Sequence, residues 1–312
     1  MAVTGASGFI GGAFLEQLAR ERHNVVALVR RPTALQGATV RVVGDLENAK
    51  GLAEALKGVD VLIHLAARAH VMREQSFGTL PLYRAVNVEG TRRLAAAAVA
   101  AGVRRIVFVS SIKVNGERTA ARPFTAGDEP APQDAYGVSK REAEAALWRI
   151  AGETDLEVTV IRPPLVYGPS VKGNMRRLAS LVQRGLPLPF GAVRNRRSFV
   201  SVYNLCDLLV RCIEHPAAAG QIFLASDGED LSTPGLIREM AAALSRPVRL
   251  WPVPVPVLRL MGRLTGSLDE IDRLCDSLQM DIAKTRELLG WHPPLSIREG
   301  FRRAMSASTP SS

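Results

Sequence analysis

Cysteine is scarce in this chain, and no hydrophobic run is long. The three cysteines, Cys206, Cys212 and Cys275, match no metal-ligand or disulfide spacing, so we expect free, buried thiols. No apolar run approaches the roughly 18–20 residues of a membrane-spanning helix. No secretory signal precedes the first glycine loop, which follows Met1 almost at once. These absences exclude a disulfide scaffold and a membrane-spanning protein, and they predict a cytoplasmic protein with no metal site.

Acidic residues are missing from one long segment. The net charge is +10, and only six of the 40 cationic residues are lysine. Residues 158–206 contain no Asp or Glu at all. A segment of one sign attracts a small polyanion such as a diphosphate. No signature of nucleic-acid binding accompanies it, so we expect no nucleic-acid partner. The cations of this acid-free segment are Arg162, Lys172, Arg176, Arg177, Arg184, Arg194, Arg196 and Arg197.

Apolar runs rich in Val and Ile alternate with alanine-rich stretches through the first half of the chain. With 312 residues, 47% of them hydrophobic, the chain is long enough for about two domains. The alternation predicts an α/β fold with a doubly wound parallel sheet (a Rossmann fold) that binds ligands at the carboxyl ends of its strands. The expected strands are 25–29, 40–43, 59–66, 105–110 and 156–162, and the expected helices are 9–22, 47–57, 88–102 and 139–152.

Beyond Pro163 the pattern changes. Proline-rich connections such as RGLPLPFG and WPVPVPV separate short amphipathic helices at 233–245 and 281–290. We therefore expect a second, smaller α/β lobe that closes over the edge of the sheet and binds the substrate. The predicted division is a dinucleotide-binding domain over 1–164, with a return segment near 195–215, and a substrate-binding lobe mainly over 165–312.

The segment TGASGFIGG places three glycines between the first strand and its helix. Gly5 permits the tight turn, Gly8 lets the backbone approach a pyrophosphate, and Gly11 lets the helix pack closely on the strand. The helix N-terminus then offers amide donors and a partial positive charge. Strand, glycine loop and apolar helix together predict a dinucleotide site.

Seven short motifs follow one another in order along nearly the whole chain. They are TGASGFIG, GDL (44–46), HLAA (64–67), VNVEGT (86–91), VSS (109–111), YGVSK (136–140) and RPPLVYGP (162–169). Together they resemble the extended short-chain dehydrogenase/reductase family, and within it the nucleotide-sugar epimerases, dehydratases and reductases. The resemblance implies a structural Asn87. It also implies cofactor contacts by Gly5, Gly8, Phe9, Ile10, Gly11, Asp45, Leu46, Leu65, Ala66, Ala67, Tyr136, Lys140 and Pro163.

Two arginines occupy the position where NAD-preferring members of the family carry an acid. Arg30 and Arg31 follow the apolar run at 25–29. A guanidinium cannot accept hydrogen bonds from ribose hydroxyls, but it can bind a 2′-phosphate bidentately. The sequence therefore favours NADP(H) as the cofactor, with NAD as the alternative.

Tyr136 and Lys140 stand four residues apart at the start of a predicted helix, on one face. A tyrosine hydroxyl titrates at about 10 in water, and the ammonium is expected to lower that pKa toward the neutral range. The resemblance implies that Lys140 also holds the nicotinamide ribose and that Ser111 hydrogen-bonds the reacting sugar oxygen. Ser111, Tyr136 and Lys140 are thus the expected catalytic residues.

The residues after Ser111 separate the family's reactions. Nucleotide-sugar dehydratases place an Asp-Glu pair there, whereas this chain has Ile112 and Lys113, which excludes a 4,6-dehydratase. The resemblance also implies that Arg197 reaches the nucleotide diphosphate and that Asn174 lies near it. His70 is a weaker candidate for the border of the sugar pocket.

Two reactions and one non-catalytic role remain. The sequence favours NADPH-dependent reduction of the C4 keto group of a UDP-4-keto-6-deoxy-N-acetylhexosamine, in the synthesis of surface-polysaccharide precursors. The alternative is a UDP-hexose 4-epimerase with tightly bound NAD, and the remote alternative is a non-catalytic NADP-binding scaffold. In each case the resemblance allows a homodimer.

Overall fold

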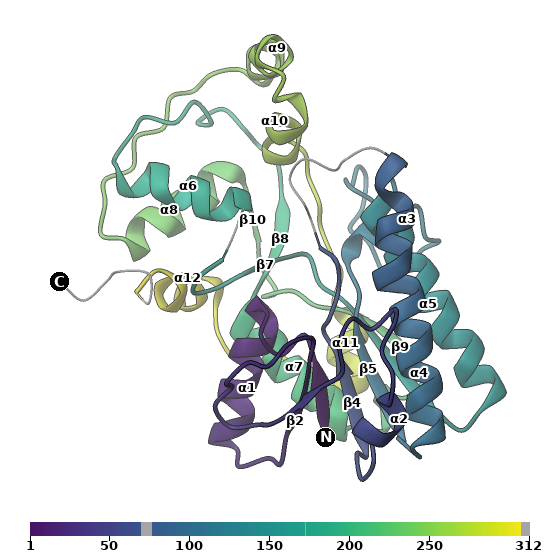
Figure 1. The fold of residues 1–312 in the computed structure, drawn as a ribbon. Helices are drawn as coiled ribbons and strands as arrows, with labels where there is room; N and C mark the ends of the chain where they lie inside the picture. The colour runs from purple at the N-terminus through teal and green to yellow at the C-terminus, as the bar shows by residue number, and fades with distance from the viewer. Residues whose placement is uncertain (70–76, 172, 307–312) are drawn as a thin grey trace.

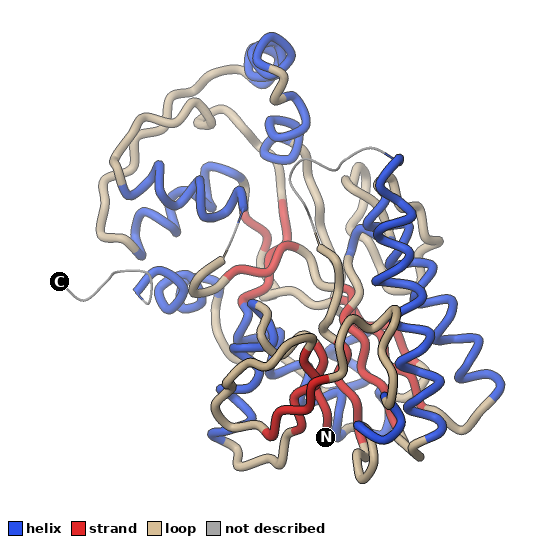
Figure 2. Tube along the Cα trace, viewed as in Figure 1, coloured by secondary structure: helices blue, strands red, loops and turns tan. Residues whose placement is uncertain are grey.

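The computed structural model describes residues 1–69, 77–171 and 173–306, so His70 and Lys172 lie outside the described residues. Its largest element is a seven-stranded parallel sheet in the order β3-β2-β1-β4-β5-β6-β9 (Figures 1 and 2). The strand order reverses between β1 and β4, and a crevice for ligands lies at such a switch point. The strands are β1 Ala2–Thr4, β2 Val26–Val29, β3 Thr39–Val42, β4 Val61–His64, β5 Arg105–Val109, β6 Glu157–Arg162 and β9 Gln221–Leu224.

The expected strands lie within a few residues of their predicted positions. Every residue of β4 and β5 is buried, as expected for parallel strands covered on both faces. β9 was not predicted, because its run of four residues is short and shows no alternation of apolar and polar positions. It pairs with β6 and forms one edge of the sheet.

Helices cover both faces of the sheet, which makes the fold doubly wound (Figure 1). One face packs against α1, α7 and α11, and the other packs against α2, α4 and α5. These helices are α1 Phe9–Arg20, α2 Leu52–Ala55, α4 Gly90–Ala100, α5 Ala135–Glu153, α7 Val202–Glu214 and α11 Ala283–Leu289.

Three predicted helices differ from the observed ones at their starts, and one of them, α5, begins at Ala135 rather than at 139. The helix expected over 47–57 is only α2, because Gly51 adopts a left-handed conformation (φ 72°) and the helix begins after it. Ahead of α4, the chain forms the short helix α3 (Leu80–Tyr83) and a π-helical turn over Arg84–Glu89. The π-helical turn contains the buried Asn87, and such turns are frequent at functional sites.

The second lobe has its own small sheet and core. β7 and β8 are parallel, and β10 pairs with β8 in the antiparallel sense. Tyr167 stacks on Phe301 with ring centroids 4.1 Å apart, in the middle of this core. The elements of the lobe are β7 Leu165–Tyr167, β8 Arg197–Ser201, β10 Asp230–Leu231, α6 Gly173–Gln183, α8 Thr233–Ala243, α9 Val255–Thr265, α10 Leu268–Cys275 and α12 Ile297–Ser306.

Cysteine burial is only partly as expected. Cys206 and Cys212 are free and buried in α7, but Cys275, at the end of α10, is free and partly exposed. The expectation was wrong for Cys275 because α10 lies at the outside of the smaller lobe and buries none of its residues fully. Within the described part of the chain, no helix is long and apolar enough to cross a membrane.

Candidate active site

The glycine loop forms a closely packed turn at the carboxyl end of β1. Gly5 has φ +67°, and a Cβ there would lie 2.7 Å from the backbone nitrogen of Ala66. A Cβ on Gly11 would lie 2.2 Å from the carbonyl oxygen of Gly5. α1 begins at Phe9 with no side-chain cap on its first turn and no acid in it. Its first amides are therefore available to an anionic group such as a pyrophosphate, so the predicted cofactor cradle fits.

A cation that follows β2 and an acid that follows β3 lie close together. The Arg30 guanidinium lies 3.5 Å from the Asp45 carboxylate, and both side chains are exposed. Arg31 is exposed beside them, whereas Leu46 is buried in the core. Asp45 thus supplies a carboxylate close to the position where the sequence lacks an acid.

A packed histidine supports the loop after β4, which contains Leu65, Ala66 and Ala67. His64 is buried, and its two ring nitrogens lie 2.7 Å from the Thr4 hydroxyl and 2.9 Å from the Thr91 hydroxyl. Burial lowers the pKa of His64 to about 3, so its ring is neutral. The amide of Ala66 in turn donates to the Thr4 hydroxyl at 3.2 Å. His64 is therefore a structural residue beneath the cofactor loop.

Asn87 joins this loop to the helix that carries Tyr136 and Lys140. Its amide oxygen accepts from the backbone of Arg68 at 2.8 Å, and its amide nitrogen donates to the carbonyl of Arg68 at 3.1 Å. The same nitrogen donates to the Ser139 hydroxyl at 2.9 Å. The structural role expected of Asn87 is confirmed by these contacts.

Ser111 lies two residues after the end of β5 and caps the short 3-10 helix Ile112–Val114, where its hydroxyl accepts from the amide of Lys113 at 3.3 Å. Asp134 caps α5 by accepting from the amide of Gly137 at 2.7 Å, and it also binds the Lys113 ammonium at 2.5 Å. The segment after Ser111 is thereby tied to the start of the helix that carries Tyr136.

Lys140 is buried beneath the end of β5. Its ammonium donates to the carbonyl of Val109 at 2.7 Å and lies 4.0 Å from the centroid of the Phe108 ring. Burial lowers the pKa of Lys140 to about 7, although Glu144 opposes the shift. Both the protonated and the neutral form of Lys140 are therefore populated near neutral pH.

Tyr136 differs from the sequence-based expectation. Burial raises the pKa of its hydroxyl, and the negative charge of Asp134 and the nearby Tyr83 raise it further. The expected lowering by Lys140 is therefore wrong for this structure, because desolvation of the phenolate dominates and Lys140 is not among the groups that shift the pKa of Tyr136. A proton-accepting Tyr136 needs additional positive charge beside it.

A buried polar network, missed by the sequence analysis, lies behind the three predicted catalytic residues. Glu144 forms a bidentate ion pair with Arg162, with bonds of 3.0 and 2.6 Å, and it also accepts from the Ser110 hydroxyl. Arg162 donates to Asn115 at 2.9 Å, and Asn115 donates to the carbonyl of Thr125 at 3.0 Å. Arg162 is thus a structural cation rather than a polyanion ligand.

This network connects the ends of β5 and β6 to α5. Ser110 precedes Ser111, and Glu144 lies one helical turn after Lys140. The carbonyl of Pro163, which follows β6, accepts from the amide of Ile112 at 2.9 Å and adds a second link. The only signals in the sequence were a Glu four residues after Lys140 and an Arg that ends an apolar strand.

The two predicted substrate ligands lie in the smaller lobe. Arg197, at the start of β8, donates to the carbonyls of Arg273 and Asp276 at 2.8 and 3.1 Å, and burial lowers its pKa. Asn174 lies at the start of α6, and its amide oxygen is buried without a hydrogen-bond partner among the described residues. An unpaired buried acceptor of this kind is suited to a donor group on a ligand.

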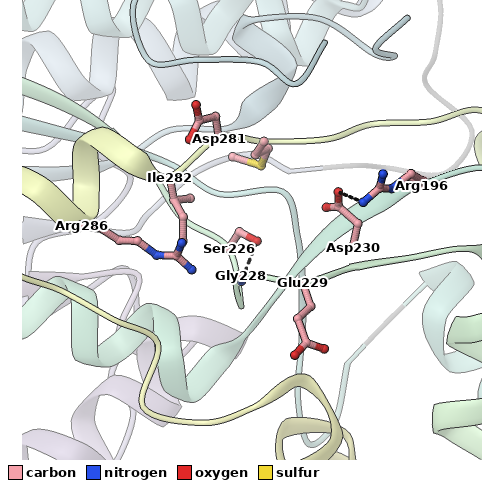
Figure 3. A pocket seen from close by; sticks show the side chains of 9 residues that line it. Arg196, Ser226, Gly228, Glu229, Asp230, Asp281, Ile282 and Arg286 are labelled. Atoms are coloured by element: carbon pink, nitrogen blue, oxygen red, sulfur yellow. Dashed lines mark hydrogen bonds and ion pairs between the residues drawn. The ribbon is translucent and has the colours of Figure 1, made fainter. Parts of the chain in front are cut away.

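A separate cavity of about 450 Å³ lies between β10 and the start of α11 (Figure 3). None of the predicted catalytic or substrate residues lines it. Asp230, on its wall, accepts from Ser198 at 2.6 Å and from Gln279 at 2.7 Å, so this acid holds β10 and the chain before α11 onto β8. The lining residues are Arg196, Ser226, Gly228, Glu229, Asp230, Met280, Asp281, Ile282 and Arg286.

Known proteins resemble this chain over nearly its whole length. Residues 1–225 match the model of the NAD dependent epimerase/dehydratase family. The chain is 46% identical to a UDP-glucose 4-epimerase of Vibrio cholerae over 308 residues, which cover 98% of this chain and 94% of the relative. It is 28% identical over 318 residues to the N-acetyl-alpha-D-glucosaminyl-diphospho-ditrans,octacis-undecaprenol 4-epimerase of Escherichia coli O157:H7, covering 96% and 92%. A solved structure of MoeE5 in complex with UDP-glucose and NAD superposes with a TM-score of 0.78 at 29% identity, over 98% of this chain and 97% of that one.

The buried network predicts a large loss of stability on removal of one charge. Glu144→Gln should lower the free energy of unfolding by about 3 kcal/mol or more, because the Arg162 guanidinium would stay buried without its carboxylate. Urea unfolding measures the change. Glu142→Gln is the matched control on the same helix: Glu142 pairs with Arg84 at the surface, 2.6 Å apart, and its loss should cost less than about 1 kcal/mol. Equal losses in the two variants would contradict the structural role of the network.

Lys140 predicts a dependence of stability on pH. Its pKa of about 7 in the folded protein lies below its ordinary value of 10.5, so between these values the unfolded chain binds more protons and stability rises with pH. Lys140→Met removes the cost of burying the ammonium, and should therefore raise the free energy of unfolding by about 1 kcal/mol or more at pH 7 and by less at pH 10. Urea unfolding at both pH values tests this. Lys57→Met, at an exposed site, should show the same small change at both, and a pH-independent effect of Lys140→Met would count against the buried ammonium.

Proposed function

Because the chain belongs to the NAD-dependent epimerase/dehydratase family, we propose that it interconverts the C4 epimers of a UDP-hexose with NAD as its cofactor. The observation that carries the proposal is the 46% identity to a UDP-glucose 4-epimerase over 98% of this chain. The UDP-glucose and NAD in the structure of MoeE5 support the same substrate class and cofactor. The NADPH-dependent reduction favoured by the sequence alone is less well supported, and its alternative takes its place.

Ser111 and Tyr136 act on the C4 oxygen in this proposal. The Tyr136 phenolate takes the proton of the C4 hydroxyl group and the resulting tyrosine later returns it, while Ser111 donates a hydrogen bond to the same oxygen as its negative charge develops. When bound, NAD supplies the acceptor and donor of the C4 hydride. Inversion at C4 would require the site to let the sugar present its opposite face to the returning hydride.

Lys140 is the cation that we assign to Tyr136, although it does not lower the pKa of that hydroxyl in this structure. Burial raises the pKa of Tyr136, so the phenolate requires a positive charge nearby to form near neutrality. Lys140 lies one turn further along the same helix face, and we assign it both this role and the binding of the nicotinamide ribose. In this structure the carbonyl of Val109 and the ring of Phe108 hold the ammonium in position.

The cofactor and substrate residues follow from the same proposal. The first-turn amides of α1, at Phe9, Ile10 and Gly11, would bind the pyrophosphate of NAD, and Asp45 would receive the adenosine end beside Arg30. Leu46, the segment 65–67 and Pro163 would line the remainder of the cleft. Arg197 would bind the UDP diphosphate with charge-assisted hydrogen bonds, and Asn174 would lie near it with its amide oxygen free to accept from a donor group of the substrate.

The reaction can be tested without any added cofactor. Purified protein incubated with UDP-glucose should form UDP-galactose, resolved by anion-exchange chromatography. Tyr136→Phe should lower turnover about 100-fold or more, as expected for lost proton transfer. Tyr203→Phe is the matched control, because it removes one hydroxyl from a partly buried tyrosine of α7, and its turnover should be unchanged.

A parallel incubation distinguishes the two reactions. UDP-4-keto-6-deoxy-N-acetylglucosamine is supplied with NADPH, and the absorbance of the reduced nicotinamide is followed. Stoichiometric NADPH consumption, with UDP-glucose left unconverted in the first assay, would overturn the epimerase in favour of the reductase.

The cofactor proposal predicts which nucleotide the protein retains. NAD should copurify with the protein and survive dialysis, whereas copurified NADP would favour the reductase. Arg30→Asp adds a ribose-binding acceptor and should raise the preference for NAD over NADP by at least about tenfold, a difference of about 1.4 kcal/mol. Titration of the stripped protein with each nucleotide measures the preference. Arg149→Asp makes the same charge change at an exposed position of α5 and should leave the preference unaltered.

A further inference from the structure

Exposed large hydrophobic side chains gather in one short segment of the smaller lobe. Of the twelve found among the described residues, six lie between residues 248 and 264. Protein surfaces rarely concentrate apolar residues without a binding partner. The six are Val248, Trp251, Val257, Leu260, Met261 and Leu264.

Four of these residues form a continuous stripe on α9. Val257, Leu260, Met261 and Leu264 follow the i, i+3, i+4, i+7 spacing of one helix face. We call them the α9 stripe; their exposed fractions are 45%, 56%, 52% and 80%. The helix has a second face, where Leu258 and Gly262 are buried, so the stripe is not the face that attaches α9 to the lobe.

α9 is attached to the protein mainly through α10. A Cβ on Gly262 would lie 3.1 Å from both the Ile271 side chain and the backbone of Leu268, which shows how closely the two helices pack. Arg259 links them further by binding Asp272 at 2.7 Å and Asp276 at 2.8 Å. Figure 1 shows α9 at the outer end of the smaller lobe, with α10 between it and the body of the molecule.

The segment around the stripe is basic. Residues 240–268 contain no Asp or Glu but include four arginines. Arg259 forms ion pairs within the helical hairpin of α9 and α10. Arg246, Arg249 and Arg263, by contrast, are exposed and form no ion pair with the part of the chain that the structure describes. Arg263 lies on α9 beside the stripe, so the helix combines an outward apolar face with an unpaired cation at its border.

We infer that the α9 stripe docks on an anionic lipid surface. A short helix with an exposed apolar face, flanking arginines and a nearby tryptophan is suited to lie in the plane of a membrane interface. Negatively charged headgroups complement the arginines of the segment. This inference concerns a surface remote from the catalytic residues and does not depend on the proposed reaction.

A second copy of the chain is a poorer occupant for the stripe. A two-fold interface presents the same patch on both subunits, so both sides of it would carry the same excess of arginine and no acid from this segment. Like charges across an interface oppose association. The lipid surface has no such conflict, because its charge is opposite.

Docking through α9 would also orient the proposed substrate site. The carbonyls of Arg273 and Asp276, at the end of α10, accept hydrogen bonds from Arg197 at 2.8 and 3.1 Å. The hairpin is thus joined at its base to the residue we assign to the nucleotide diphosphate. A lipid-docked enzyme would hold that end of the smaller lobe toward the membrane.

Vesicle flotation of the full chain tests the inference. The protein should float with vesicles containing phosphatidylglycerol, and less with pure phosphatidylcholine vesicles or in high salt. The double variant Leu260→Glu/Leu264→Glu should bind at least about tenfold more weakly, because it places two charges in the apolar stripe. Arg263→Gln should weaken binding about fivefold to the anionic vesicles.

A control pair separates docking from general changes in charge. Val42→Glu/Leu288→Glu adds the same two charges at exposed apolar positions of β3 and α11, and should float like the wild type. The melting temperature of each variant, measured alongside, confirms that it is folded. Absence of flotation by the wild type, equal flotation of the two double variants, or a wild-type dimer that the stripe variant dissociates in sedimentation would each overturn the proposal.

Discussion

The buried ion pair between Glu144 and Arg162 is the interaction on which the geometry of the site depends. Both side chains are almost fully removed from water, so the pair is stable only while every remaining polar atom is satisfied. Ser110 and Asn115 provide those partners, and they come from the two sides of Ser111. The energetic demand of the buried charges therefore fixes the position of Ser111 relative to α5. The geometry of the proposed catalytic site thus follows from a core constraint rather than from contacts among the proposed catalytic residues themselves.

Burial also sets the protonation behaviour of the site. It lowers the pKa of His64 and of Lys140, and it raises the pKa of Tyr136. His64 becomes a neutral structural group, since two threonine hydroxyls bind its ring nitrogens. Lys140 is left close to half-protonated at neutral pH, and Tyr136 is left dependent on it. The proposed proton transfer thus uses a tyrosine and a lysine whose pKa values are set by burial rather than by their mutual attraction. Burial moves the two pKa values apart.

Local patterns predicted most of the sheet and the glycine loop, because parallel strands and their turns depend on short runs of sequence. β9 was missed, since its four residues carry too little periodicity to distinguish a strand from a loop. Motifs predicted the proposed catalytic residues, but they did not predict the buried network that supports them. Glu144 and Arg162 are 18 residues apart, one in α5 and the other at the end of β6, and nothing in either element indicates that they pair. The raised pKa of Tyr136 was likewise not predictable, because it depends on three-dimensional burial.

The two positions after Ser111 explain why this fold suits oxidation and reduction at C4 but not loss of water. Ile112 is 3% exposed and packs in the core between the sheet and α7, so a carboxylate there would be buried without a partner. Lys113 extends the other way and binds Asp134, the residue that caps α5. Where a dehydratase carries two proton-transferring acids, this chain uses one residue for packing and one to hold the helix of Tyr136. In the proposed reaction, proton transfer is then left to Tyr136 alone, assisted by Ser111, which is sufficient for a reaction that moves one proton and one hydride at a single carbon.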